Sequence, residues 1–322
     1  MADNNVVIAQ GFDIIGDIHG YVDSLKELLK ELGYSQKSGI WRHPKRKAIF
    51  VGDLVDRGNG QRELCELVRN MVEAGCAEMC IGNHELNAIA YATLGNEGHY
   101  LRKHSEKNNK QHQSFIDEYP LGSAIHSKVI SWFKTLPLWL ELKMQSGQSS
   151  RVIHAYWDQK RIENLKPYLQ KTEQGFVLGE EFDHRLFRKG EEAFELVEFI
   201  LKGPEIDLPK GGSYLDKGGI RRYQSRVKWW EKGRTWMESC LFGGADLEGF
   251  DPNEEIDNLS LEIYQDSIPV FFGHYWMNGD LRVQTPKIAC LDWSIAKGGR
   301  LVAYRWDGES ELTVDKMVAV SA

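Results

Sequence analysis

The chain has 322 residues, of which 42% are hydrophobic and 27% charged, a composition typical of a globular protein with a sizeable core. Its net charge of −7 argues against a dedicated nucleic-acid-binding surface. No apolar run approaches the ~20 residues that span a bilayer, and the N-terminus does not resemble a signal peptide, so no membrane partner is expected. The five scattered cysteines favour free thiols and a cytoplasmic location.

The first half of the chain alternates strand-like and helix-like patterns. Short apolar runs predict buried strands, and leucines at helical spacing predict helices between them. The expected strands span 12–15, 48–51 and 79–81, and the expected helices span 22–32, 64–71 and 85–92. This alternation is typical of a parallel sheet with crossover helices.

The rest of the chain is less regular. A polar stretch over 95–113 predicts a long loop, and its histidines, His99, His104 and His112, are expected to be solvated rather than bound to metal. An amphipathic segment at 130–136 follows. Residues 157–267 are interpreted as a mostly helical and irregular insertion, a lid or specificity region within a single domain over 1–322. Strand patterns lie at 138–143, 151–154, 269–272, 287–291, 301–306 and 311–314, and the last four predict antiparallel closing strands.

Several of the predicted strands end in a side chain that can bind metal. The motifs are GDIHG at 16–20, GDLVDRG at 52–58 and GNHE at 82–85, followed by a histidine at 154 and a GH pair at 273–274. Because ligands collect beyond the carboxyl ends of strands in α/β sheets, these residues are expected to meet. The candidate metal ligands are Asp17, His19, Asp53, Asn83, His154 and His274.

This donor set mixes imidazole, carboxylate and amide groups, which suits Mn, Fe, Zn or Co better than Ca. Six ligands are too many for one catalytic ion, so two ions are expected, with Asp53 as the candidate bridge. A single Asp or His at a strand end can also be a simple cap, and GDIHG alone does not decide. Four motifs in this order favour the metal site.

The motifs resemble those of the calcineurin-like metallophosphoesterases. The DRG form of the second motif resembles the phosphoprotein-phosphatase branch and the bacterial symmetrical diadenosine tetraphosphate hydrolases, and residues 291–306 are similar to a closing strand pair of those hydrolases. The resemblance covers about residues 11–156 and 268–316 and leaves the insertion unmatched. It implies an α/β fold, a four-layer α/β/β/α sandwich of two mixed sheets with a large insertion.

The resemblance also implies a division of the ligands between two divalent ions, Mn first, with Fe, Zn, Ni or Co as alternatives. The first ion would be held by Asp17, His19 and Asp53, and the second by Asp53, Asn83, His154 and His274. A hydroxide bridging the ions would attack phosphorus in line.

Three further residues take catalytic roles by the same resemblance. His84 would protonate the leaving oxygen, Asp56 would orient His84, and Arg57 would clamp phosphate oxygens. His84 could instead cap the following helix, and Asp56 and Arg57 could be a local ion pair.

Relatives among the protein phosphatases carry a second phosphate-binding arginine between the two late histidines. The candidates here are Arg221 and Arg222, for which a plain surface role is the alternative. Trp157 could stack on a substrate, although a core or lid position is the favoured interpretation.

The predicted function is therefore a metal-dependent phosphoric ester hydrolase. It is expected to act on phosphate monoesters, phospho-Ser/Thr/Tyr proteins included. The alternative is a hydrolase of dinucleoside polyphosphates, and a non-catalytic phosphate-binding module is a third hypothesis. An aromatic slot would favour the dinucleotide and a large flat groove the phosphoprotein.

Overall fold

In the computed structural model, which describes residues 6–96, 98–216, 219–242, 246–256 and 263–322, two mixed β-sheets face each other between outer helices. In the order of the strands, the first sheet holds β1 (Val6–Ala9), β7 (Trp139–Met144), β8 (Ser149–Ile153), β17 (Val270–Phe272) and β18 (Ile288–Cys290). The second holds β19 (Asp292–Trp293), β20 (Arg300–Trp306), β2 (Phe12–Ile15), β5 (Lys47–Phe50) and β6 (Ala77–Met79), and β21 (Met317–Ser321) pairs with β20.

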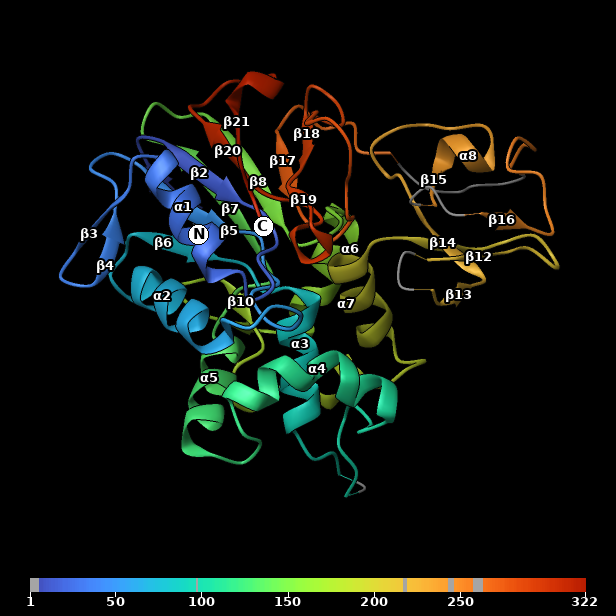
Figure 1. The fold of residues 1–322 in the computed structure, drawn as a ribbon, viewed down its shortest axis with the longest axis horizontal. Coiled ribbons are helices and arrows are strands. Elements are labelled where there is room, and N and C mark those ends of the chain that lie inside the picture. The colour runs from blue at the N-terminus through green and yellow to red at the C-terminus, as the bar shows by residue number, and fades with distance from the viewer. Residues whose placement is uncertain (1–5, 97, 217–218, 243–245, 257–262) are drawn as a thin grey trace.

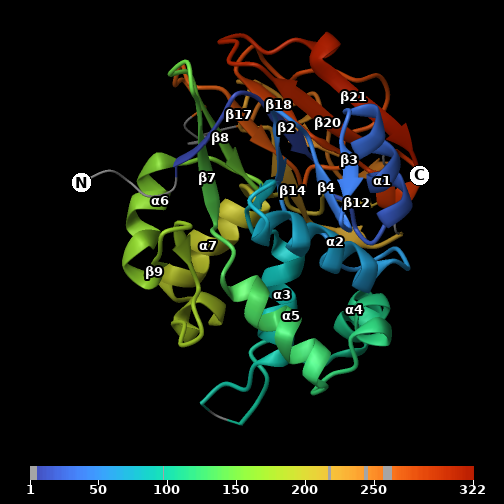
Figure 2. The same cartoon turned by 90° about the vertical axis from the view of Figure 1, so that its left-hand side faces the viewer.

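The helices complete the layers. They are α1 (Val22–Glu31), α2 (Gln61–Glu73), α3 (Asn83–Ala92), α4 (Glu106–Glu118), α5 (Ala124–Lys134), α6 (Gln159–Leu165), α7 (Glu192–Lys202) and α8 (Trp236–Ser239). Figure 2 shows the layers in sequence, from α6 and α7, through the sheet with β7 and β8, through the sheet with β2 and β20, to α1. The predicted four-layer α/β/β/α sandwich is confirmed.

The central strands form because their residues are buried on both sides. All four residues of β2 are buried, including Asp13. Burying that carboxylate is tolerated because Arg46 and Arg305 donate to it at 2.9 and 3.2 Å. Helix α1 covers this sheet with the apolar face that its leucine spacing predicts.

The parallel pairing of β2, β5 and β6 aligns their carboxyl ends. Ile15 lies opposite Phe50, and Phe50 lies opposite Met79, so the three segments that follow leave the sheet at one edge. In the other sheet β8 and β17 are also parallel, with Val152 opposite Phe271. The motifs of the two sheets therefore start from neighbouring strand ends, as the sequence predicts.

The loop predicted over 95–113 is wrong in its second half. Helix α4 begins at Glu106, where the Ser105 side chain accepts a hydrogen bond from the Asn108 N–H at 3.3 Å. The helix is rich in Asn, Gln and Lys, and its buried face contains His112 and Phe115. That face contains too few apolar residues to show the 3.6-residue period of a helix.

The longer helices of the insertion end at Lys202. Beyond it, the described residues 205–216, 219–242 and 246–256 form a lobe with short strands and the short helix α8, which we call the β-lobe and which projects to the right in Figure 1. Its strands are β11 (Glu205–Asp207), β12 (Ser213–Leu215), β13 (Arg221–Arg222), β14 (Gln224–Val227), β15 (Cys240–Leu241) and β16 (Leu247–Glu248). Strands of two to four residues are too short to show alternation, so the expectation of mostly helical structure is wrong here, although much of the described lobe is irregular as expected.

The β-lobe has a hydrophobic core of its own. Its buried members are Leu208, Tyr214, Trp236, Cys240 and Phe242. The rest of the chain shares one large core that includes both sheets. The short strands of the lobe are therefore stabilised by packing within the lobe, and not only by the main sheets.

Two predictions about the closing strands need correction. Strands β17 and β18 run parallel, with Phe271 opposite Ala289, because the connection between them is long enough for a crossover. The strand expected at 311–314 lies later, at β21, after a 3₁₀ turn over Val314–Lys316. The antiparallel pairing of β20 with β2 and β21 agrees with the prediction.

The remaining strands are short and form two two-stranded sheets. They are β3 (Ser35–Lys37), β4 (Ile40–Arg42), β9 (Gln170–Lys171) and β10 (Phe176–Val177). Among the described helices, none combines the length and the apolarity needed to cross a membrane. The five cysteines are free, as expected from their scattered positions.

Candidate active site

Asp53 lies where the loops from the two sheets meet. Its Oδ2 atom lies 3.4 Å from Nε2 of His154, 3.7 Å from Nε2 of His19 and 3.9 Å from Nε2 of His84. All four side chains are buried. The carboxylate belongs to two groups of potential metal ligands, one with His19 and His84 and the other with His154 and His274.

The histidines around Asp53 are oriented as metal ligands usually are. Nδ1 of His19 donates to the Val55 carbonyl, and Nδ1 of His154 donates to the Val51 carbonyl, both at 2.9 Å. A backbone acceptor on Nδ1 leaves Nε2 as the donor atom for a metal. The Asn83 side-chain oxygen lies 3.0 Å from Nε2 of His154, so it faces the same point.

Two of the predicted ligands carry buried polar atoms with no hydrogen-bond partner among the described residues, and these atoms are Oδ1 of Asp17 and Nε2 of His274. Burying such atoms without a partner is costly, and a bound cation would satisfy both of them. The other oxygen of Asp17 accepts the backbone N–H of His274 at 3.0 Å, which ties the first motif to the last.

The charges of the site also fit a cation. Burial and the neighbouring carboxylate of Asp292 raise the pKa of Asp17 well above its ordinary value, with a further contribution from Asp53. Burial and the nearby His84 lower the pKa of His19 to about 4, which keeps that imidazole neutral and available as a ligand. Buried carboxylates in this number are stabilised by divalent cations, so the donor set fits the predicted metal ions.

The backbone is held in unusual conformations at three of the candidate ligands. His19, Asp53 and His274 have positive φ angles of 48°, 53° and 68°, a region that costs free energy for residues other than glycine. At Gly273, an added Cβ would lie 1.9 Å from Oδ1 of Asp17, so only glycine permits this approach of the two loops. Strain of this kind is typical of functional sites.

Glu85, the last residue of GNHE, holds two of the motifs together. Its buried carboxylate accepts the backbone N–H groups of Asp53 at 2.9 Å, Leu54 at 2.8 Å and Gly82 at 2.9 Å. A fourth donor, the N–H of Val55, lies at 3.3 Å. The side chain therefore fixes the loop that carries Asp53 to the start of α3, which carries Asn83.

His84 and Asp56 form the predicted pair. Nδ1 of His84 lies 2.5 Å from Oδ2 of Asp56, and its Nε2 points toward Asp53. Burial disfavours the charged imidazolium, but the carboxylates of Asp53 and Asp56 outweigh it and raise the pKa of His84. The His84 ring thus has Nδ1 hydrogen-bonded to the Asp56 carboxylate and Nε2 directed toward Asp53.

His112 was expected to be solvated, and that expectation is wrong. The residue is buried in α4, and its Nδ1 lies 2.7 Å from Oδ1 of Asp56. Asp56 therefore has a histidine on each oxygen. The helical position of His112 is hidden in a polar segment, and no motif spacing connects it to GDLVDRG. His104 is stacked between Tyr91 and Tyr100, and His99 is exposed, so only His99 behaves as predicted.

Arg57 lies at the surface beside the centre. It has a positive φ of 78°, and its guanidinium lies 5.7 Å from the Trp276 ring. Within the described part of the chain no ion pair is recorded for Arg57. The alternative of an Asp56–Arg57 ion pair is not supported, since Asp56 is buried against the two histidines.

The candidate second arginines lie away from the ligands. Arg221 pairs with Glu248 at 2.6 Å, and Arg222 pairs with Asp216 at 2.7 Å, both exposed on the β-lobe. Arg226, four residues further on, contacts a candidate ligand instead, because its Nη1 donates to the His274 backbone carbonyl at 2.8 Å. The sequence favoured Arg221 and Arg222 over Arg226, because the position of Arg226 depends on the pairing of β14, which no sequence spacing shows.

Trp157 is a core residue. Its side chain is 2% exposed, and the Arg151 guanidinium lies 4.8 Å from its ring. The neighbouring Asp158 caps α6 by accepting the N–H of Arg161 at 3.0 Å. The favoured interpretation of a packed tryptophan is thus supported, and the ring is not placed to stack on a substrate.

Two bacterial sequences illustrate what the chain is similar to. It is 36% identical over 133 residues to the bis(5'-nucleosyl)-tetraphosphatase PrpE (asymmetrical) of Oceanobacillus iheyensis, covering 41% of this chain and 51% of that one. It is 49% identical over 74 residues to the protein of the same name from Halalkalibacterium halodurans, covering 23% and 30%. The chain therefore spans about half, or less, of the length of these relatives. Their names specify asymmetrical hydrolysis, whereas the sequence motifs suggested the symmetrical type.

Solved structures with a similar overall arrangement have low sequence identity. One, named provisionally as a diadenosine tetraphosphatase, has a TM-score of 0.48 and 17% identity and covers 99% of this chain and 98% of that one. Another, a protein serine/threonine phosphatase from Saccharomyces cerevisiae, has a TM-score of 0.47 and 13% identity and covers 99% and 83%.

The family profile described as calcineurin-like phosphoesterase matches residues 12–275, a range that contains the four sequence motifs and all six candidate ligands. The resemblance identified from the motifs is confirmed, and the predicted enzyme class, a metal-dependent phosphoric ester hydrolase, is the one that the family name describes. The chain belongs to the calcineurin-like phosphoesterase family.

Proposed function

We propose that the chain is a metal-dependent hydrolase that cleaves a phosphoanhydride bond of dinucleoside polyphosphates. The observation that carries the proposal is the position of Asp53, whose carboxylate belongs to two groups of buried ligands and faces the His84–Asp56 pair. The substrate class is supported by relatives, 33% to 49% identical over part of their length, that are named as asymmetrical tetraphosphatases.

The proposed roles of the residues are as follows. The proposed ligands are Asp17, His19 and Asp53 for one ion, and Asp53, Asn83, His154 and His274 for the other. Divalent cations at these positions, with Mn²⁺ proposed first and Fe, Zn, Ni or Co as alternatives, would polarise the phosphoryl group and lower the pKa of water in the site. Arg57, exposed beside the centre, binds the non-bridging phosphate oxygens with its planar fork.

His84 donates a proton from Nε2 to the leaving oxygen. Asp56 holds Nδ1 of the same ring and so fixes the direction in which Nε2 points. Positioned proton donors of this kind contribute about 10²–10⁴-fold to rate. A nucleotide is a better leaving group than an alkoxide, so the contribution of His84 is smallest for an anhydride substrate.

A second candidate is hydrolysis of phosphate monoesters, phosphoproteins included, which was the first expectation from sequence. The same residues suit it, because Arg57 is exposed and suits a terminal phosphoryl group. The two candidates differ in what lies on the leaving-group side of the phosphorus. They share every proposed metal ligand and the His84–Asp56 pair.

The test is product analysis on metal-stripped protein reconstituted with Mn²⁺. Diadenosine tetraphosphate and a phosphopeptide mixture are supplied in parallel, with the Asp53→Asn protein as control. We expect ATP and AMP from the dinucleotide, formed faster than phosphate from the peptides. Faster release of phosphate from the peptides would establish the second candidate. If the protein hydrolyses neither substrate while both metal positions are loaded, both candidate functions are contradicted.

A further inference from the structure

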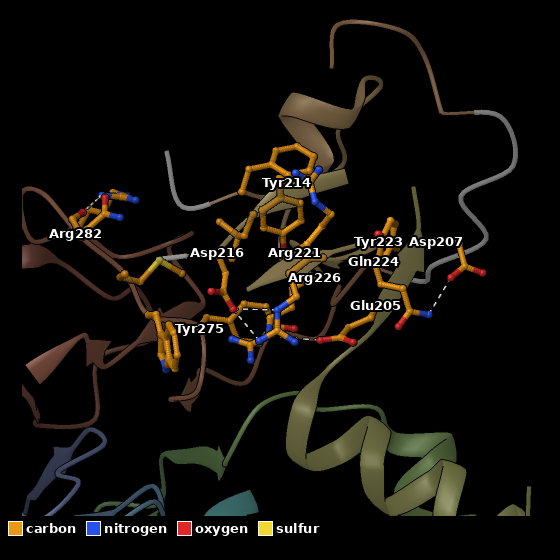
Figure 3. Close-up of a pocket in the computed structure, with 16 residues that line it drawn as sticks. Glu205, Asp207, Tyr214, Asp216, Arg221, Tyr223, Gln224, Arg226, Tyr275 and Arg282 are labelled. Carbon is orange, nitrogen blue, oxygen red and sulfur yellow. Dashed lines mark hydrogen bonds and ion pairs between the residues drawn. The ribbon is translucent and has the colours of Figure 1, made fainter. Parts of the chain in front are cut away.

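A pocket of about 590 Å³ lies between the β-lobe and the loop that follows His274 (Figure 3). Tyr275, Trp276 and Met277 come from that loop, and Tyr214 and Gln224 come from the β-lobe. The volume lies in the range of small-molecule sites, about 300–1,000 Å³. Its aromatic lining suits a flat ring system.

Arg226 connects this pocket to the proposed metal site. It lines the pocket, and its Nη1 donates to the carbonyl of the proposed ligand His274 at 2.8 Å. Its guanidinium lies 5.8 Å from the rings of both Tyr275 and Trp276. A molecule whose phosphate lies at the metal site can therefore extend past His274 and Arg226 into the pocket.

Trp276 stands at the boundary between the two regions. Its φ is 48°, and its N–H donates to Oδ2 of Asp292 at 2.8 Å, which holds the strained backbone in place. The guanidinium of Arg57 lies 5.7 Å from the ring, and the Lys297 ammonium lies 4.0 Å from it. The Trp276 ring is thus held between these cations and the aromatic lining of the pocket.

The charges inside the pocket are largely matched. Arg221 pairs with Glu248, Arg222 with Asp216, and Arg226 with Glu205 at 3.6 Å. Matched cations leave little attraction for a polyphosphate within the pocket itself. Among the described residues, no ion pair is recorded for Arg57, on the side of the metal site, or for Arg282, which lines the pocket and donates to the backbone carbonyls of Asn278 and Asp280. The pocket therefore suits the uncharged part of a substrate whose phosphates lie beside Arg57.

The pocket also offers groups that bind heterocycles and sugars. Asn278 supplies an amide, and Gln224 supplies another whose Nε2 donates to Asp207 at 2.8 Å. Glu205, which pairs with Arg226, and Asp207 supply carboxylates with further lone pairs for ribose hydroxyls or an exocyclic amine. Tyr223 lines the same pocket and is 64% exposed, so its ring is available to stack on a base.

We infer that this pocket binds one nucleoside of a dinucleoside polyphosphate, while the phosphate chain passes Trp276 and Arg57 to the metal site. The inference rests on the proposed function and adds the place where the nucleoside lies. A phosphopeptide is the competing occupant. Aromatic rings and amides on facing walls favour the compact nucleoside over an extended backbone.

The first test measures binding of adenosine to the metal-free protein by titration calorimetry, so it does not depend on catalysis. Tyr223→Ala and Trp276→Ala are expected to weaken binding by about fivefold or more, because each removes an aromatic face. Met237→Ala is the control, because Met237 is an exposed apolar residue of the same lobe outside the pocket, and it should bind adenosine as the native chain does. Absence of binding at millimolar adenosine, or equal binding by all variants, would overturn the inference.

The second test compares kcat/KM for diadenosine tetraphosphate with kcat/KM for para-nitrophenyl phosphate. Tyr223→Ala should lower the first by about fivefold more than the second. If adenosine binds as expected and the dinucleotide is not cleaved, the pocket assignment stands and the proposed function fails. If the dinucleotide is cleaved with the same kcat/KM by Tyr223→Ala and the native chain, the function stands and the pocket assignment fails. A selective loss of phosphopeptide hydrolysis would assign the pocket to peptides instead.

Discussion

His112 donates from Nδ1 to Asp56 across 2.7 Å, and it does so from a helix 56 residues further along the chain. The opposite oxygen of Asp56 lies 2.5 Å from His84. His112 in α4 therefore holds the carboxylate of Asp56, which is proposed to orient the acid His84. Rotation of this carboxylate would require α4 to move. Because Asp56 is buried, loss of either histidine leaves a charge that is only partly satisfied.

We predict that His112→Ala lowers kcat by about tenfold or more, since a hydrogen bond to a charged group contributes about 1.5–3 kcal/mol. Metal content should not change, because His112 contacts no proposed ligand. His112→Asn, which can still donate to Asp56, should recover part of the rate. His99→Ala, in the exposed loop before α4, is the control. Equal rates for the alanine variant and the native chain would show that Asp56 needs no second partner.

We predict that Asp53→Asn removes most of the bound metal and lowers activity by about 10³-fold or more, because the residue serves both ligand groups and metal-ion catalysis contributes several kcal/mol. Metal per chain is measured by mass spectrometry of the digested protein. A variant that retains native metal content and rate would remove the bridging assignment.

We predict that His84→Asn retains both metal ions and loses rate according to the leaving group. An alkyl phosphate should lose about 10²-fold or more, whereas para-nitrophenyl phosphate and diadenosine tetraphosphate, with their better leaving groups, should lose much less. Rates with the three substrates at saturation provide the comparison. A loss of the same size for all three would mean that His84 acts on binding or folding and not as the acid.

We predict that Glu85→Gln destabilises the chain by about 1–3 kcal/mol, because an amide nitrogen would face backbone N–H groups that now donate to a carboxylate. Denaturant unfolding of the metal-free protein measures this directly. The control is Glu66→Gln, an exposed residue of α2 whose ion pair with Arg62 should contribute less than ~1 kcal/mol. If the two variants unfold at the same denaturant concentration, Glu85 does not hold the loops together.

We predict that chelation of the metal ions lowers the thermal unfolding midpoint of the native chain and has little effect on Asp53→Asn. Ligands that bind only the folded state stabilise it according to their concentration and affinity. The buried, unpartnered atoms of Asp17 and His274 are the physical basis of this expectation. Calorimetry with and without a chelator measures the shift. An unchanged midpoint in the native chain would argue against metal binding at these residues.

The sequence predicts the positions of the candidate metal motifs well, because their geometry is set locally. GDIHG and GNHE each follow a short apolar strand, and parallel pairing of these strands brings the motifs to one edge. The strand order alone is enough to place Asp17 and Asn83. That order follows from the β-α-β alternation.

The surroundings of the motifs depend on tertiary packing and are less predictable. His112 reaches Asp56 only because α4 packs beside α2, a relationship that no sequence spacing encodes. Likewise, Arg226 rather than Arg221 or Arg222 reaches His274 because β14 pairs with β11 and β15 in the β-lobe. Strands this short are stabilised by their lobe's own core and leave little periodicity in the sequence.

Strand β2 leads into the first motif, yet its two neighbours come from opposite ends of the chain. It pairs with β5, and on its other side with β20, where Ile15 lies opposite Ala303. During synthesis, one edge of β2 therefore remains without a partner until residues 300–306 have left the ribosome. An unpaired edge of this kind can pair with other chains, so nascent molecules depend on late completion of the sheet. Any truncation before β20 would leave an exposed strand directly before the proposed ligands of GDIHG, and the loss would be in solubility as well as in catalysis.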